Sequence, residues 1–169
     1  EHVGITGLDA SLMPAFRYLV EQTPDDASGV DSRADIEALV NQAQQLQSDR
    51  LAQIRDYADS PTDNPAPTTS TYDLAGLSGV SEDNLSGLDS VLAAATIGAD
   101  ETDTIAELQA IIDAYNHVNS DTTSPAADFA AIGVDLTGIT DSVVIDPDTG
   151  FGQYDAGIDL FNDLVAQDA

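Results

Sequence analysis

Apolar residues recur at helical spacing in two adjacent stretches of the second half of the chain. Leu85, Leu88, Val91 and Leu92 follow one another at intervals of three, three and one residues, which predicts an amphipathic helix. A second apolar stripe occupies residues 105–118 and predicts another helix. Short polar and glycine-containing segments separate these stripes. The pattern therefore predicts an all-α fold.

The same pattern occurs earlier in the chain, at an offset of 72 residues and without gaps. The matched pairs are Gly4/Gly76, Ile5/Leu77, Gly7/Gly79, Leu8/Val80, Met13/Leu85, Phe16/Leu88, Leu19/Val91, Val20/Leu92, Asp31/Asp103, Ile36/Leu108, Leu39/Ile111 and Val40/Ile112. A more divergent third copy places "ADFAAIGV" at 127–134 against "YDLAGLSGV" at 72–80. Self-similarity at a fixed period indicates tandem modules.

Capping residues predict where the helices begin. Ser81, followed by two acidic residues, predicts one helix start, and Thr104 or Asp103 predicts the next. A short third helix precedes them and is expected to be capped by Thr71, as Ser124 caps its equivalent in the following copy. Each unit is therefore predicted to be a small three-helix bundle.

The predicted domain organisation follows from these copies. Residues 1–59 form a first repeat that lacks its opening helix and has an extended last helix, from about residue 31 to residue 58. Three prolines among small polar residues predict a linker at 60–71. The second repeat is placed at 72–124. A third, irregular repeat with a Gly/Asp-rich loop is placed at 125–169.

Charge excludes several classes of partner. The chain has 31 acidic residues against four basic ones, a formal net charge of -27. The basic residues are Arg17, Arg33, Arg50 and Arg55. Such a surface repels phosphate backbones, so we expect no nucleic-acid binding, and we expect salt or bound cations to offset the self-repulsion. The longest apolar stretch, 90–99, is too short to span a bilayer, so we expect no membrane insertion.

Residues suited to catalysis are scarce, so we predict that the protein is not an enzyme. It has no cysteine and no lysine, and its two histidines are His2 and His117. The position of His117 in the last turn of a predicted helix is explained by the helix dipole. The glycines of "GITG" and "GLSG" lack the lysine and the strand-loop-helix context of a phosphate-binding loop.

One acidic loop suggests a cation site. Asp146 and Asp148 have the spacing of the first two oxygen ligands of a calcium loop, and Gly150 could form its turn. The twelfth position is Gly157 instead of glutamate, so a simple Pro-Asp-Thr-Gly turn is the favoured interpretation. We expect no required cofactor, and only weak, labile Ca²⁺ binding across the acidic surface.

The strings "DLAGLSGVSEDNLSGLDSVLAAA" at 73–95 and "DTIAELQAIIDAY" at 103–115 resemble the helical tandem repeats of large bacterial cell-surface adhesins. The layout is also similar to small three-helix protein-binding modules of bacterial surface proteins, such as albumin-binding ones. The resemblance implies an extracellular location at the cell surface and a role in reach or adhesion. It also implies export within a much longer polypeptide.

Two functions remain open at this point. The first is a structural segment of a stalk, adhesin or filament, with neighbouring repeats or subunits of the same protein as its partners. The alternative is a helical module that docks a host protein or a neighbouring subunit. Candidate contact residues for docking are Tyr18, Phe151 and Tyr154, whereas Phe16 lies on the predicted core stripe.

Overall fold

Helices make up most of the described protein. The structure is a computed structural model that describes residues 6–24, 29–94, 96–120, 123–134 and 142–144. Its elements in chain order are α1 (Met13–Glu21), α2 (Arg33–Asp59), α3 (Thr69–Leu74), α4 (Leu85–Leu92), the 3-10 helix η1 (Ala99–Glu101), α5 (Ile105–Ser120), β1 (Thr123–Pro125), α6 (Ala126–Ala131) and β2 (Ser142–Val144). The predicted all-α class is confirmed for this part of the chain.

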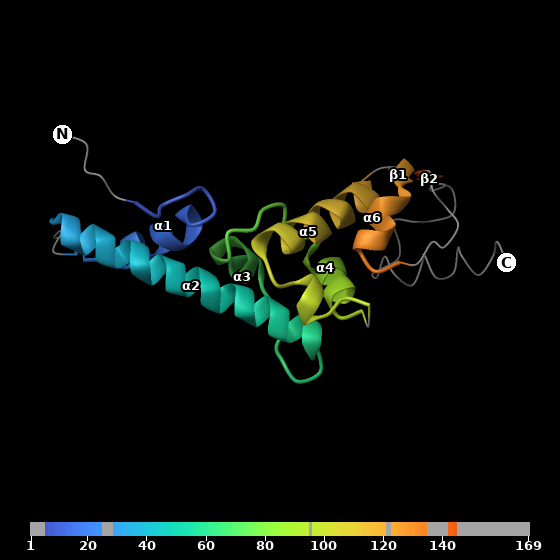
Figure 1. The fold of residues 1–169 in the computed structure, drawn as a ribbon, viewed down its shortest axis with the longest axis horizontal. Coiled ribbons are helices and arrows are strands. Elements are labelled where there is room, and N and C mark those ends of the chain that lie inside the picture. The colour runs from blue at the N-terminus through green and yellow to red at the C-terminus, as the bar shows by residue number, and fades with distance from the viewer. Residues whose placement is uncertain (1–5, 25–28, 95, 121–122, 135–141, 145–169) are drawn as a thin grey trace.

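The two strands form a minimal antiparallel ribbon. Thr123 pairs with Val144, Ser124 with Val143 and Pro125 with Ser142. Strand β1 lies between α5 and α6 in the chain, and β2 follows α6. The ribbon lies toward one end of the molecule (Figure 1). It does not change the helical class.

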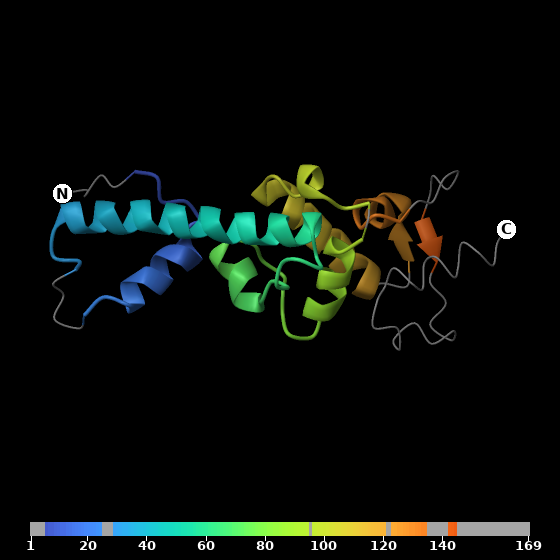
Figure 2. The ribbon, with the colours of Figure 1, turned by 90° about the horizontal axis from the view of Figure 1, so that it is seen from below.

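The helices pack around two hydrophobic cores. The smaller core consists of Leu12, Ala15, Val40, Ala43 and Leu74. The larger core consists of Ile54, Ala58, Tyr72, Ala75, Leu77, Leu88, Val91, Leu92, Ile97, Leu108, Ile111, Ile112, Ala114, Tyr115, Val118, Phe129, Ile132 and Val134. We call α1 with α2 the first helix pair, and α4 with α5 the second helix pair. Figures 1 and 2 show these pairs following one another along the long axis of the molecule.

Helix α2 connects the two cores because it is long enough to reach both. Its first half contributes Val40 and Ala43 to the smaller core, and its last turns contribute Ile54 and Ala58 to the larger core. The sequence predicted a helix from about residue 31 to residue 58, and the observed helix spans Arg33–Asp59. The long helix therefore acts as a continuous connection between the two pairs.

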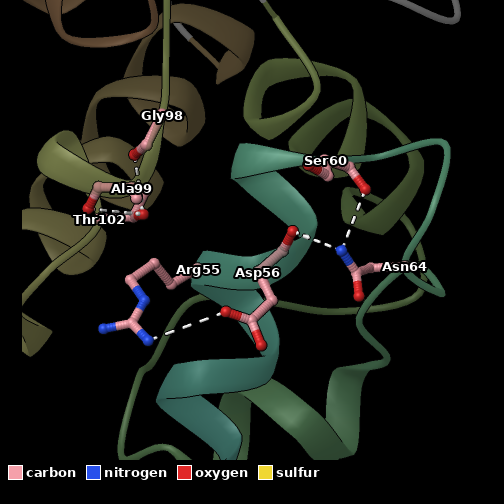
Figure 3. Close-up of polar contacts among 7 residues, drawn as sticks. All are labelled: Arg55, Asp56, Ser60, Asn64, Gly98, Ala99 and Thr102. Carbon is pink, nitrogen blue, oxygen red and sulfur yellow. Dashed lines mark hydrogen bonds and ion pairs between the residues drawn. The ribbon is translucent and has the colours of Figure 1, made fainter.

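The end of α2 is closed by a side chain from the segment that follows it. The Asn64 amide nitrogen donates hydrogen bonds to the carbonyl oxygens of Asp56 at 2.8 Å and Ser60 at 3.1 Å (Figure 3). The same two carbonyl oxygens also accept backbone hydrogen bonds, Asp56 from the Ser60 amide and Ser60 from the Asp63 and Asn64 amides, so the side chain adds a further bond to each. Pro67, in the same segment, is fully buried. The segment that was predicted as a linker thus makes specific contacts with the helices around it.

Of the four predicted caps, Thr71 and Ser81 are wrong in position and Thr104 is right, whereas Ser124 lies in β1, two residues before α6 begins at Ala126. Helix α3 is capped by Thr68, which forms a reciprocal capping box with Thr71 at the third helical position. Ser81 does not cap α4, which begins at Leu85 after Asn84 and has no side-chain cap bond. Thr104 is confirmed as the cap of α5, because its hydroxyl accepts from the Glu107 amide at 3.2 Å.

Candidate functional site

The segment between α3 and α4, residues 75–84, is held in place by two left-handed glycines and several hydrogen bonds, and we call it the joint. Helix α3 ends at Leu74, and two residues later Gly76 has φ 83° and is followed by Leu77, whose amide donates to the Tyr72 carbonyl at 3.0 Å. This left-handed glycine closes the helix in the way that helix C-termini commonly end. A side chain at Gly76 would also collide with the carbonyl oxygen of Ser11, which lies just before α1. Only glycine fits both the turn and the close approach.

A second glycine, Gly79, connects the joint to α5 through a hydrogen bond. Gly79 has φ 82°, and its carbonyl oxygen accepts hydrogen bonds from the amide nitrogens of Asn84 at 2.7 Å and Asn116 at 2.9 Å. Next to it, Ser78 and Gln109 exchange two hydrogen bonds, at 3.0 and 3.1 Å. These bonds fix the path of the chain from α3 to α4 against the helix that follows.

The same device is found 72 residues earlier, at the entry to α1. Gly7 has φ 85°, and its carbonyl oxygen accepts from the amide nitrogen of Gln44 at 3.4 Å. Gln44 stands at the position that corresponds to Asn116. The capping box at the start of α2, between Ser32 and Asp35, likewise corresponds to the Thr104 cap of α5. The sequence correspondence therefore extends to backbone conformation and hydrogen bonding.

A half-buried carboxyl group lies where α2, α3 and α4 meet. The Tyr72 hydroxyl donates to the Asp89 carboxylate at 3.2 Å, and the Tyr57 hydroxyl donates to the Asp89 carbonyl at 3.4 Å. Burial raises the pKa of Asp89 to about 6, although the hydrogen bond from Tyr72 acts in the opposite direction. Burial and the charge of Asp89 also raise the pKa of Tyr72 and of Tyr57.

With its pKa raised to about 6, the Asp89 carboxyl group can gain or lose a proton near neutral pH. Because its partners are tyrosines of neighbouring helices, this proton affects the packing of the helices. Asp89 links α2, α3 and α4 through the hydrogen bonds from Tyr57 and Tyr72. The sequence analysis missed Asp89, although a signal was present: Asp89 lies four residues after Leu85 and three before Leu92, on the apolar side of the helix. An acidic residue on that side had to be buried against partners.

His117 joins two helices. Its Nδ1 atom lies 2.6 Å from the Asp128 carboxylate of α6, and the two side chains are 41% and 23% exposed. The sequence analysis explained His117 by the dipole of its own helix and did not identify this partner. The contact places His117 in the packing of α6 against α5.

The predicted contact residue Tyr18 lies on the surface. Its side chain is 44% exposed, and it shares this property with Leu8 at 37% and Met13 at 38%. Met13 matches Leu85 of the predicted apolar stripe in the 72-residue correspondence, yet it is exposed. Phe16 is half-buried against the smaller core, as its place on the stripe predicted.

The other predicted site residues, Asp146, Asp148, Gly150, Phe151 and Tyr154, lie outside the described residues. Within the described ranges there is no group of three or more His, Asp or Glu side chains that could hold a metal ion. Among the helices that the structure describes, none combines the length and apolarity of a membrane span. Comparisons with protein-family models, with curated proteins and with solved structures found no match to this chain.

Proposed function

We propose that the chain is a non-enzymatic repeat segment of a large bacterial surface protein, where it serves reach, attachment or assembly as part of a stalk, adhesin or filament. The observation that supports this most directly is the duplicated joint. Gly7 with Gln44 and Gly79 with Asn116 repeat one backbone conformation and one hydrogen bond at an interval of 72 residues. Repetition of a joint is typical of proteins that extend by adding modules.

The proposal includes tandem three-helix bundles. A first unit at 1–59, a linker at 60–71, a second unit at 72–124 and a third at 125–169 account for the sequence copies. Helix α3 supports this arrangement because it packs between the units: Leu74 belongs to the smaller core, and Tyr72 belongs to the larger one. A short helix shared by two cores holds consecutive units at a defined spacing.

Helix α2 gives the segment stiffness along its length. It has 27 residues, and at about 1.5 Å per residue it is about 40 Å long. Because it enters both cores, the two helix pairs cannot rotate freely about a simple loop. A net charge of -27 adds repulsion between modules and keeps them soluble, and the adhesin-like sequence favours a place at the bacterial cell surface.

Small-angle X-ray scattering of the full chain tests the mechanical part of this proposal. We expect an elongated particle whose maximum dimension changes little between 0.15 and 1 M NaCl, because α2 and α3 hold the units apart. A compact particle of nearly equal dimensions would contradict it. Antibody labelling of intact source cells, with and without surface proteolysis, tests the proposed location, and labelling that requires permeabilised cells would contradict it.

Weak calcium binding is a further part of the proposal. The acidic surface and the candidate ligands Asp146 and Asp148 suggest that Ca²⁺ stiffens the segment. We expect millimolar CaCl₂ to raise the melting temperature more than NaCl of equal ionic strength does. Equal shifts in the two salts would remove calcium from the function.

A second candidate function is docking of a host protein or neighbouring subunit. The three exposed apolar side chains Leu8, Met13 and Tyr18 favour it. Beads that carry the chain can be compared with beads that carry a Tyr18→Ser variant on surfaces coated with serum proteins. An Asp113→Ser variant, changed at an exposed position of α5, serves as the control. Loss of adhesion in the first variant alone would favour this function.

A further inference from the structure

Helices α2 and α3 hold the two helix pairs together. Each contributes residues to both cores: α2 through Val40 and Ile54, and α3 through Leu74 and Tyr72. Figure 2 shows α3 beside the middle of α2, so both helices run through the region where the pairs meet. The position of the second pair relative to the first therefore depends on how α4 is held against α2 and α3.

Asp89 of α4 makes hydrogen bonds with both of these helices. Its carboxylate accepts a hydrogen bond from the Tyr72 hydroxyl of α3 at 3.2 Å, and its carbonyl oxygen accepts one from the Tyr57 hydroxyl of α2 at 3.4 Å. Tyr72 is buried, whereas Asp89 and Tyr57 are half-buried. We call these three residues the Asp89 cluster. The cluster joins α4 to the two helices that the pairs share.

The titratable groups that face Asp89 are tyrosines. Tyr57 reaches it from α2 and Tyr72 from α3, and burial together with the charge of Asp89 raises the pKa of both hydroxyls. From α5, the Tyr115 hydroxyl reaches α4 at Gly87, two residues before Asp89. Tyrosine hydroxyls are neutral below about pH 10, so these groups supply no positive charge to balance an ionised Asp89.

The charged side chains next to these tyrosines in the sequence lie in solvent. Asp56 on α2 and Asp73 on α3 are exposed, and Arg55 lies 3.8 Å from the Asp56 carboxylate (Figure 3). Burial therefore dominates the titration of Asp89 and raises its pKa to about 6, while the hydrogen bond from Tyr72 acts in the opposite direction. Neutral Asp89 fits the closed cluster better than ionised Asp89 does.

The repeated framework does not require a carboxyl group at this position. The corresponding residue of the first pair is Arg17, which is exposed. In the second pair an asparagine would offer the same kind of oxygen acceptor to Tyr72 without a charge to bury. An aspartate at position 89 therefore adds a property that the hydrogen bond alone does not need, which is a dependence on pH.

We propose that the Asp89 cluster is a pH-sensitive hinge, in which neutral Asp89 holds α4 closed against α2 and α3 and ionised Asp89 loosens this contact. An ionised carboxylate gains hydration when it moves toward water, and α4 shifts away from Tyr72 when it does so. The segment is then stiffer in mild acid than above neutral pH. The use of this hinge to control reach rests on the proposed function, whereas the hinge itself is a property of the chain.

Distances between two spin labels test the proposal directly. The chain has no cysteine, so Gln42→Cys on α2 and Ala110→Cys on α5, both at exposed positions, provide unique attachment sites. In about 0.5 M NaCl, which screens repulsion among the other acidic residues, we expect a narrow distance distribution at pH 5 and a broader one at pH 7.5. The broadening should have its midpoint near pH 6, where Asp89 titrates. An identical distribution at both pH values would overturn the proposal.

Three variants of the labelled chain make the result specific to the cluster. Asp89→Asn keeps an oxygen acceptor and cannot ionise, so its distribution should stay narrow at both pH values. Asp73→Asn removes an exposed acid from α3 and is the matched control, which should broaden as the unchanged chain does. Tyr72→Phe removes the hydrogen bond that stabilises the carboxylate, so the midpoint should move to higher pH. Equal responses of the two Asn variants would overturn the proposal, and so would a midpoint that Tyr72→Phe leaves unmoved.

Amide hydrogen exchange measures the size of the effect. After correction for the intrinsic pH dependence of exchange, opening of α4 should increase between pH 5 and 7.5 by about fivefold more in the unchanged chain than in the Asp89→Asn variant. Equal increases would overturn the hinge. A chain that is elongated in scattering but has no such difference would leave the proposed function intact, whereas a compact particle with a working hinge would contradict only that function.

Discussion

The first and second helix pairs use the same polar framework and differ in their apolar packing. In each pair a left-handed glycine, Gly7 or Gly79, presents its carbonyl to an amide side chain on the second helix. Each second helix also begins with a capping box, at Ser32 or Thr104. Yet apolar residues at matching positions differ in burial. Leu88, Val91, Leu92 and Leu108 of the second pair are buried, whereas their counterparts in the first pair are only half-buried, namely Phe16, Leu19, Val20 and Ile36. Equal local structure therefore does not guarantee equal burial.

The facing positions at the centre of each pair show how the packing diverged. The first pair has Ala15 and Ala43, both completely buried, and the second has Gly87 and Tyr115 at the corresponding positions. A side-chain carbon at Gly87 would occupy the space of the Tyr115 hydroxyl group. The first pair thus has two alanines where the second pair has a glycine and a tyrosine. The two pairs fill the same place with different volumes, so α4 and α5 are packed through an aromatic ring.

The largest expected effect is a difference in the stability lost when a leucine of the second pair, rather than one of the first pair, is replaced by alanine. Leu88→Ala, at a position 1% exposed, should lower the free energy of unfolding by about 3 kcal/mol because it leaves a cavity. Leu19→Ala makes the same chemical change at a half-buried position and should cost about 1 to 2 kcal/mol. Urea unfolding followed by circular dichroism measures both. Equal losses of stability would show that Leu19 is as deeply buried as Leu88.

A double-mutant cycle should show the coupling between Gly87 and Tyr115. Gly87→Ala overpacks the core and should cost about 2 kcal/mol, and Tyr115→Ala leaves a cavity and should cost about 3 kcal/mol. The double variant recreates the Ala–Ala pair of the first helix pair, so it should cost about 2 kcal/mol less than the sum.

The control for this cycle is Gly98→Ala. A side-chain carbon there would lie 3.5 Å from the nearest atom, a Glu101 carboxylate oxygen, and would meet no obstruction. We expect little change in the urea midpoint of this variant. Strictly additive effects of the two core substitutions would contradict the proposed exchange of volumes.

Asp89, where the first pair has Arg17, should make stability depend on pH. The pKa of Asp89 is raised to about 6, above the value of about 3.9 for an unfolded chain, so the folded state holds the proton more tightly. The resulting stabilisation is fully present below about pH 4 and is lost as the pH rises through about 6.

Relative to an Asp89→Asn variant, the protein should gain about 1 kcal/mol of stability when the pH falls from 7.5 to 5, after allowance for solvent screening. The variant shares the general loss of repulsion between the other acidic residues, so the difference isolates Asp89. Parallel stability curves for the two proteins would contradict the burial of this carboxyl group.

The smallest effect concerns the shared polar framework. Ser32→Ala and Thr104→Ala each remove the hydroxyl of a capping box and should each cost about 0.5 to 1 kcal/mol. Hydrogen exchange should show faster opening of the first turn of α2 or α5. If only one substitution had an effect, the two frameworks would not be equivalent.

Much of the helical structure could be predicted because its signals are local. The stripe from Leu85 to Leu92 and the extent of α2 depend on residue spacing that any isolated segment displays. Caps were less predictable, since Ser81, Thr71 and Thr104 are all chemically suitable and only the surrounding turns decide which hydroxyl meets a free amide. The candidate calcium ligands and the loop aromatics remain predictions.

The contacts at the joint could not be predicted from local pattern. Whether Asp89 meets Tyr72 depends on how α3 crosses α4, and the pairing of His117 with Asp128 depends on the direction in which α6 returns along α5. Both contacts join residues that are more than ten positions apart in the sequence. Their distances are properties of packing.

The sequence by itself determined the helical class, the period of 72 residues and the glycines at which the chain must turn, because spacing, capping chemistry and the freedom of glycine act within a few residues. Only the tertiary structure decided that α2 enters two cores and that α3 lies beside its middle. The same decision left one side of the first pair partly open. Burial depends on which helices are neighbours in space, and two segments with matching stripes acquire different neighbours when one of their helices is longer.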